Sequence, residues 1–96
     1  MKILFVISNP ASTEALLGLT EACIRRNQPF LCFFTGDGVK ILADANFTEV
    51  ISKAERAVVC EFSWAKYFPN QISPIEEGSQ TDNSAMVSTV EKVVSL

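Results

Sequence analysis

The chain carries five consecutive apolar residues at Phe30-Leu31-Cys32-Phe33-Phe34 and a second apolar run at Ile3-Leu4-Phe5-Val6-Ile7. Neither run alternates with polar residues, so neither suits a strand with one face in water. Uninterrupted runs of this length are typical of strands covered on both faces, as in a parallel sheet. The valine-rich segments Ala57–Cys60 and Val90–Leu96 predict a third and a fourth strand.

Helical segments separate these strands. Residues 13–27 place apolar side chains at helical spacing, and we expect Ser12 or Thr13 to cap this helix. Gly18 lies inside it, where glycine costs about 1 kcal/mol relative to alanine, and a close helix–sheet contact would explain it. Further helical turns are expected over 39–45, 47–53, 62–68 and 84–89, the last capped by Asp82 or Asn83, while 70–83 is expected to be mostly loop.

This alternation predicts an α/β fold. Strands that alternate with helices imply right-handed crossovers, a parallel sheet and helices on both of its faces. We therefore expect one domain over residues 1–96, a three-layer α/β/α structure with a small parallel sheet of four to five strands. The expected strand order is 2-1-3-4, of flavodoxin-like type.

The composition excludes several classes of function. The chain has 96 residues, of which 48% are hydrophobic, and a net charge of −3. An acidic chain of this kind lacks the basic face that a nucleic-acid-binding protein needs. There is no histidine, so Ser–His–Asp and Cys–His catalysis and the usual zinc sites are excluded. No cofactor and no metal ion is expected.

The three cysteines, Cys23, Cys32 and Cys60, form no C-x-x-C pair. The spacing excludes a zinc knuckle, an iron–sulfur cluster and a thioredoxin-type dithiol. No apolar run approaches the ~20 residues of a membrane span, and the apolar start is too short for a signal peptide. We expect a soluble, cytoplasmic protein with reduced thiols.

Ligands of open parallel sheets bind at the carboxyl ends of the strands. We therefore look for candidate functional residues directly after each predicted strand. Cys60 is the one cysteine at such an end, whereas Cys23 and Cys32 fall on buried faces and are expected to be inert. A helix that starts near Phe62 would place amide donors at the Cys60 sulfur, and Lys66 would also favour the thiolate. Glu61 would disfavour the thiolate if its side chain pointed inward.

Three other groups of residues accompany this cysteine. Gly36-Asp37-Gly38 predicts either a metal or hydroxyl contact or an ordinary turn, and the polar turn at Ser8-Asn9 predicts either an anion site or a helix cap. The aromatic residues Trp64, Tyr67 and Phe68 predict core edge, a lid over the thiol or a subunit contact, of which we favour the subunit contact. The candidate substrate-binding residues are therefore Ser8, Asn9, Gly36, Asp37, Gly38, Glu61, Trp64 and Lys66.

Taken in order, four segments of the chain resemble the DsrE/DsrF-like (TusD-like) sulfur-relay family. They are the opening strand and turn at 3–10, the stretch Phe33-Phe34-Thr35-Gly36-Asp37-Gly38-Val39, the strand-end cysteine in Val58-Val59-Cys60, and Glu91-Lys92-Val93-Val94. The resemblance implies a small cytoplasmic DsrE-like α/β/α protein that carries sulfane sulfur as a persulfide on Cys60. Its implied partners are sulfur donor and acceptor proteins and other subunits, as a homo-oligomer (dimer, trimer or hexamer) or a hetero-oligomer with related subunits.

The chain departs from that family in two ways. It is shorter than a typical TusD-like subunit, and an acidic and aromatic segment, 61–66, replaces the basic helix that often follows the carrier cysteine. Two alternatives therefore stay open beside a sulfur carrier: a non-catalytic DsrE-like oligomer subunit, and a small-ligand or nucleotide-binding domain that uses the turn at Ser8–Thr13.

Overall fold

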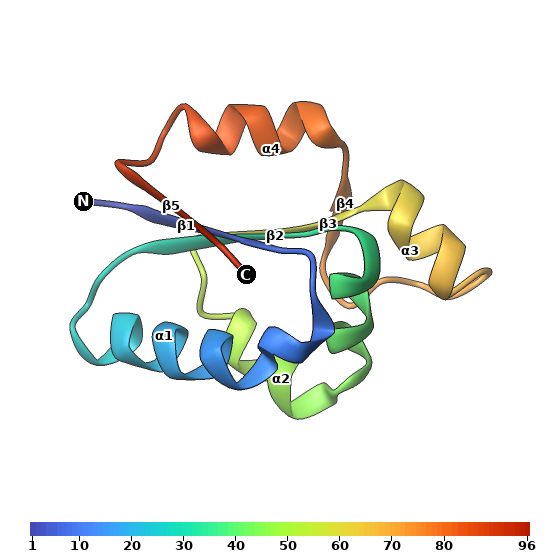
Figure 1. Ribbon diagram of the computed structural model, residues 1–96, viewed down its shortest axis with the longest axis horizontal. Helices are drawn as coiled ribbons and strands as arrows, with labels where there is room; N and C mark the ends of the chain where they lie inside the picture. Colours follow the sequence, from blue (N-terminus) through green and yellow to red (C-terminus); the bar gives the residue numbers. More distant parts are fainter.

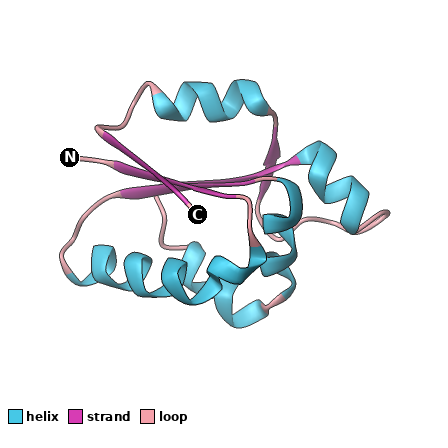
Figure 2. Ribbon diagram, viewed as in Figure 1, coloured by secondary structure: helices cyan, strands magenta, loops and turns pink.

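A computed structural model describes all 96 residues and contains one sheet of five parallel strands (Figure 1). The strands are β1 (Ile3–Ile7), β2 (Phe30–Phe34), β3 (Arg56–Cys60), β4 (Glu76–Gly78) and β5 (Lys92–Ser95). Helices lie on both faces of the sheet, so the predicted three-layer α/β/α fold is confirmed (Figure 2). None of the helices has the length and the apolar character that crossing a bilayer requires.

The strand order is β4-β3-β2-β1-β5, so the predicted order 2-1-3-4 is wrong. The third strand lies beside β2 and not beside β1, since Phe33 pairs with Val6 on one side and with Val58 on the other. All five residues of β2 are buried, because β2 is the middle strand and helices cover both faces of the sheet there. The short strand β4 lies inside the segment that was predicted to be loop.

The direction in which the chain crosses from strand to strand determines which face of the sheet each helix covers. The chain steps from β1 to β4 in one direction and returns to the far side of β1 only for β5. Right-handed crossovers in one direction place their helices on one face, and a reversal moves the next helix to the other face. Accordingly, α1 (Thr13–Arg25) and α2 (Ala45–Ile51) cover one face and α4 (Gln80–Val87) covers the other (Figure 1).

The sheet separates two hydrophobic cores of unequal size. The core under α1 and α2 has 14 buried residues, among them Phe5 and Phe34. The core under α4 has six: Leu4, Leu31, Phe33, Val58, Cys60 and Met86. Because side chains alternate between the faces of a strand, Cys32 belongs to the larger core and Cys60 to the smaller one.

Ser12 occupies the N-cap position of α1, as one of the two predicted residues, but neither predicted hydroxyl caps the helix. Ser12 makes no side-chain capping bond, and the Thr13 hydroxyl donates to the carbonyl of Pro10 at 2.8 Å. A short 3-10 helix, η1 (Pro10–Ser12), precedes α1, and the Asn9 side chain caps it by accepting from the N–H of Ala11 at 2.9 Å. The polar turn thus starts a 3-10 helix, and α1 continues directly from it.

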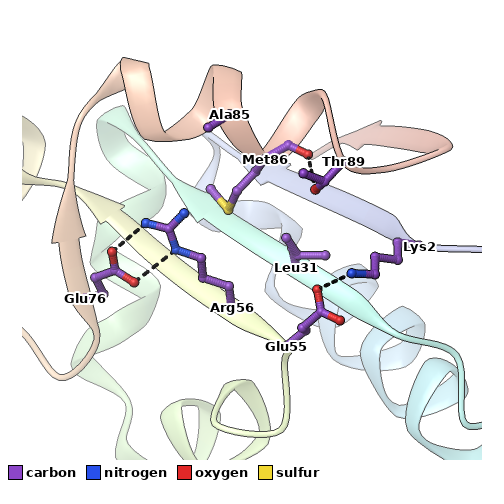
Figure 3. Close-up of a pocket in the computed structure, with 8 residues that line it drawn as sticks. All are labelled: Lys2, Leu31, Glu55, Arg56, Glu76, Ala85, Met86 and Thr89. Atoms are coloured by element: carbon purple, nitrogen blue, oxygen red, sulfur yellow. Dashed lines mark hydrogen bonds and ion pairs between the residues drawn. The ribbon is translucent and has the colours of Figure 1, made fainter.

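Helix α4 begins earlier than predicted, after Ser79 and not after Asp82 or Asn83. The Ser79 hydroxyl accepts from the N–H of Thr81, and the Asp82 carboxylate accepts from the N–H of Ser79. This reciprocal capping box satisfies amides that the helix leaves unpaired at its start. A cavity of about 360 Å³ lies between the other end of α4 and the sheet, with Leu31 and Met86 among its lining residues (Figure 3).

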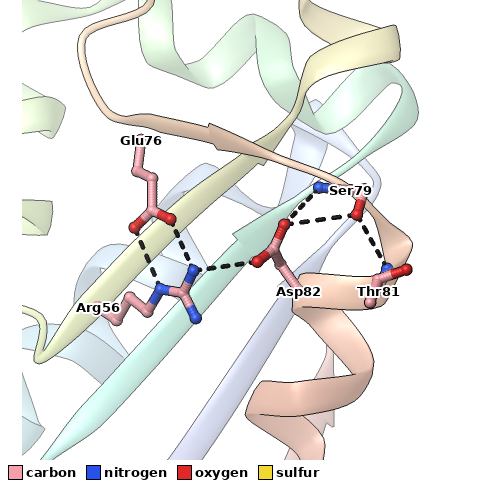
Figure 4. A network of polar contacts seen from close by, with 5 residues as sticks. All are labelled: Arg56, Glu76, Ser79, Thr81 and Asp82. Atoms are coloured by element: carbon pink, nitrogen blue, oxygen red, sulfur yellow. Dashed lines mark hydrogen bonds and ion pairs between the residues drawn. The ribbon is translucent and has the colours of Figure 1, made fainter.

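An ion-pair network fastens β4 and α4 to β3. The Arg56 guanidinium holds the Glu76 carboxylate with two hydrogen bonds of 2.6 and 3.1 Å, and it donates a third to Asp82 at 3.2 Å (Figure 4). Its hydrogen bond to Arg56 lowers the pKa of Glu76. The pKa of Asp82 is lowered first by the Ser79 N–H and then by Arg56.

The network predicts how stability depends on pH. Carboxyl groups whose pKa is lowered by folding stabilise the native state above their ordinary pKa values, and this stabilisation is lost as the pH falls through the lowered values. We expect Glu76→Gln to be less stable than the wild type at pH 7, and the difference to shrink when the pH falls below the ordinary value of 4.5. Urea denaturation at several pH values measures the difference in unfolding free energy between the variant and the wild type. Glu77→Gln, which removes an exposed neighbour outside the network, is the control; a difference that does not change with pH would contradict the assignment.

Substitution by alanine is expected to have opposite effects on stability at Gly18 and at Gly38. A Cβ at Gly18 meets nothing within 4 Å, so the close helix–sheet contact suggested by the sequence is absent. A Cβ at Gly38 would collide with the backbone carbonyl of Ile7. We therefore expect Gly18→Ala to stabilise the protein by ~0.5–1 kcal/mol and Gly38→Ala to destabilise it by ~1–3 kcal/mol, as measured by urea denaturation. Equal effects at the two positions would contradict this packing.

Candidate functional site

Cys60 lies where β3 ends and α3 (Glu61–Tyr67) begins, at the carboxyl edge of the sheet. It is the residue immediately before the helix, so its side chain stands beside the first free amides of α3. Only 8% of the residue is exposed. The sequence predicted both the strand end and the adjacent helix start, which the structure places one residue earlier, at Glu61.

Polar donors around the sulfur stabilise the thiolate. Burial raises the pKa of the Cys60 thiol, but the hydroxyl and N–H of Ser63, the N–H of Phe62 and the hydroxyl of Thr35 together outweigh it, and the pKa is lowered. The thiol makes no close capping bond with the helix amides. The donors therefore favour the charged form without binding the sulfur tightly, and a lowered pKa is what a nucleophilic cysteine needs.

Ser63 connects the cysteine to the neighbouring loop. Its oxygen accepts a hydrogen bond from the N–H of Gly36 at 2.9 Å, and the residue is buried. The hydroxyl donates to no other group of the chain, so its proton can point at Cys60 while the oxygen accepts from Gly36. Sequence reasoning missed Ser63 and Thr35 as site residues. The available signals were a serine three positions after the strand-end cysteine and a threonine directly after β2.

The Gly36-Asp37-Gly38 segment begins the 3-10 helix η2 (Gly36–Ala43). Gly36 has a φ of +54°, a conformation that favours glycine. Gly38 packs directly on the end of β1, where no side chain fits. The two glycines thus have backbone roles, and they hold the loop against both β1 and α3.

Asp37 belongs to a cluster on the side of α3 that faces η2. The Tyr67 hydroxyl donates a hydrogen bond to the Asp37 carboxylate, which raises the pKa of Tyr67. The ammonium groups of Lys40 and Lys66 lie 4.6 and 5.3 Å from the centre of the Tyr67 ring. Lys66 thus contacts the tyrosine, and the groups that lower the pKa of Cys60 do not include it.

Trp64 belongs to the edge of the larger core. It is 5% exposed, stacks on Phe68 with ring centres 4.4 Å apart, and donates its indole N–H to the carbonyl of Gln71 at 2.8 Å. Of the three roles suggested by the sequence, this packing fits core edge. Glu61, in the first turn of α3, is exposed.

Ser8 and Asn9 lie apart from the cysteine. They follow β1, and β2 separates β1 from β3 in the sheet. Asn9 uses its side-chain oxygen to cap η1. The structure therefore brings Cys60 together with the loop at 35–38 and α3, and the turn after β1 reaches this group only where Ser8 packs against Gly38.

The other two thiols have the opposite electrostatic environment. Burial raises the pKa of Cys23, and it raises that of Cys32 much further, with the nearby Cys23 adding to the effect. Cys32 is completely buried inside β2. Among the three cysteines, only Cys60 has a pKa shifted towards the thiolate.

Cavities of 270–410 Å³ lie elsewhere on the molecule, and none of the five is lined by Cys60. In the cavity under α4, Lys2 pairs with Glu55 at 2.8 Å and Arg56 with Glu76 at 2.6 Å, so its cationic groups are already neutralised (Figure 3). No three cysteine, aspartate or glutamate side chains gather closely enough to hold a metal ion.

Comparisons with known proteins identify the fold. No protein-family model and no curated protein matches the chain. One solved structure is similar: a conserved protein of unknown function, BT1422, from Bacteroides thetaiotaomicron, with a TM-score of 0.75. It is 13% identical in sequence, and the match covers 99% of this chain and 94% of that one. The whole chain therefore has the architecture of an existing protein.

The site predicts a selective thiol reaction. Because its pKa lies below the ordinary value of 9.0, we expect Cys60 to react with iodoacetamide at lower pH than Cys23 or Cys32. Replacing Ser63 by alanine removes a donor to the sulfur, so the pH midpoint of Cys60 alkylation should rise. Peptide mass spectrometry after timed alkylation measures each site.

The matched control is Ser88→Ala, which removes a hydroxyl directly after α4 that donates only to the backbone carbonyl of Ala85. It should leave the midpoint unchanged. Faster labelling of Cys23 than of Cys60 in the folded protein would contradict the assignment.

Proposed function

We propose that this protein is a sulfur carrier that holds sulfane sulfur as a persulfide on Cys60 and passes it between partner proteins. The observation that supports it best is the position of Cys60, nearly buried at the end of β3 and directly before α3, where hydroxyl and amide donors lower the pKa of its thiol. Burial alone has the opposite effect, as Cys23 and Cys32 show. The resemblance of the 33–39 and 58–60 segments to the DsrE-like family supports the same chemistry.

The reaction is an exchange at sulfur. The Cys60 thiolate attacks the outer sulfur of a donor persulfide, a new S–S bond forms, and the donor S–S bond breaks with its electron pair leaving on the donor thiolate. An acceptor thiolate then attacks the outer sulfur on Cys60, and Cys60 leaves as a thiolate. No net oxidation occurs, and no histidine is required, because the hydroxyl and amide donors stabilise the thiolate in both steps.

The surroundings of Cys60 suit a protein partner. No cavity at the thiol encloses a small molecule, whereas Phe62, two residues along α3, is 78% exposed. Exposed aromatic residues are enriched where proteins meet. Docking over Phe62 would bring a partner cysteine to the start of α3.

A non-catalytic subunit is the second candidate. The low exposure of Cys60 favours it, because a thiol that stays covered does not exchange sulfur. In that case Cys60 and its neighbours at the carboxyl edge of the sheet have only a packing role. The protein then acts only by assembling with other subunits. The two candidates differ in whether Cys60 gains sulfur in the folded protein.

Intact mass spectrometry distinguishes them. We expect the wild type to gain the mass of one sulfur atom after incubation with a persulfide donor such as glutathione persulfide, and to lose it when a thiol acceptor is added. Cys60→Ser should gain none, and Ser63→Ala should gain it more slowly at neutral pH, because less of its Cys60 is ionised.

Cys23→Ser is the matched control, since it removes a buried thiol of raised pKa and should load like the wild type. A wild-type protein that gains no sulfur while folded would exclude the sulfur-carrier function and leave the non-catalytic subunit.

A further inference from the structure

Strand β5 forms an open edge of the sheet. It pairs with β1 on one side, and nothing pairs with it on the other. Unpaired edges are templates for another strand, and proteins usually cover them or keep them short and charged. Exposed apolar side chains lie at this edge on both faces of the sheet. Val93 is 45% exposed on the face that α4 covers, and Leu19 of α1 is 41% exposed on the opposite face.

The backbone of β5 offers two unpaired residues. The Leu96 N–H donates inward to the carbonyl of Val6 at 2.8 Å. Because peptide groups alternate in direction along a strand, Val94 also points its N–H and C=O towards β1. Val93 and Ser95 therefore point theirs away from the sheet. These two residues flank Val94 symmetrically.

We propose that two copies of this chain pair through β5 in antiparallel fashion, about a two-fold axis that passes beside Val94. Val93 of each copy then forms a hydrogen-bonded pair with Ser95 of the other, so all four unpaired backbone donors find acceptors. The two Val94 residues face each other across the axis. This edge is complementary to itself, which is what a two-fold interface requires.

The side-chain layers fit the same arrangement. A cavity of about 270 Å³ opens between α1 and β5, and most of its lining is apolar, with Leu19, Cys23 and Val94 among the lining residues. The second copy brings its own Val94 to the mouth of this cavity. On the other face, the exposed Val93 gains a neighbour from the second copy. The hydrophobic core on each face of the sheet would thus extend from one copy into the other.

Charge selects the antiparallel arrangement. Lys92 is the charged residue within β5, and it lies at the start of the strand. Antiparallel pairing centred on Val94 places Lys92 opposite Leu96 and separates the two lysines by four residues along the strands, about 13 Å. At physiological ionic strength, charges farther apart than ~8 Å are largely screened. A parallel pairing in register would instead put the two lysines side by side.

Oligomeric state and register both test this proposal. Sedimentation velocity of the 96-residue chain over a wide concentration range should give twice the protomer mass of 10.5 kDa. Val93→Glu should be monomeric while retaining its circular dichroism spectrum. The control is Ile72→Glu, which alters another exposed residue, in the loop before the other edge strand, β4. This variant should stay dimeric.

A cysteine at position 94 reports the register independently. In a non-hydrogen-bonded antiparallel pair the facing Cα atoms are ~4.5 Å apart, which a disulfide spans, whereas Cα atoms more than about 7 Å apart cannot be bridged. Val94→Cys should therefore form a covalent dimer on mild oxidation with diamide, and Lys92→Cys and the wild type should not. A wild type that is monomeric throughout, a dimeric Val93→Glu, or cross-linking at Lys92→Cys equal to that at Val94→Cys would each overturn the proposal.

Discussion

The burial of Phe30–Phe34 on both faces is the constraint on which the rest of the structure depends. Five consecutive apolar residues leave no side that tolerates water, so the strand needs neighbours along both edges and a helical layer above and below. The central position of β2, between β1 and β3, meets the first need. The reversal of direction after β4 meets the second, because it sends α4 to the face that α1 and α2 leave open.

The same arrangement creates the environment of Cys60. Central β2 brings Thr35 to the carboxyl edge beside the end of β3, and the loop that follows reaches α3 through the bond from Gly36 to Ser63. The thiol is thereby held between a small apolar core and a ring of donors. Burial and polar donors act in opposite directions on its pKa, and the donors prevail. The other two cysteines lie in the larger core, where no such donors lower the pKa.

Local patterns in the sequence predicted most elements of the fold and the position of the cysteine. Apolar runs predicted the four longer strands, and the helix expected over 62–68 lies within one residue of the observed start of α3. The predicted strand order was wrong, because the uninterrupted apolar run Phe30–Phe34 indicates burial on both faces and not which strands lie beside it. Strand β4 was missed because Glu76–Gly78 is too polar to be recognised as a strand; the ion pair between Glu76 and Arg56 and the pairing with β3 hold it in the sheet. Lys66 was expected to act on the thiol, but it lies over the ring of Tyr67.

The sequence by itself determined the α/β class, the small parallel sheet, the absence of histidine chemistry and the one cysteine at a strand end, because each of these follows from residue type and from spacing along the chain. Only the tertiary structure decided which strands are neighbours, which face of the sheet carries Cys60, and that Ser63 and Thr35 stand beside its sulfur. Those features depend on contacts between residues far apart in sequence. Such contacts are set by how the whole chain buries its apolar surface, and no local pattern records them.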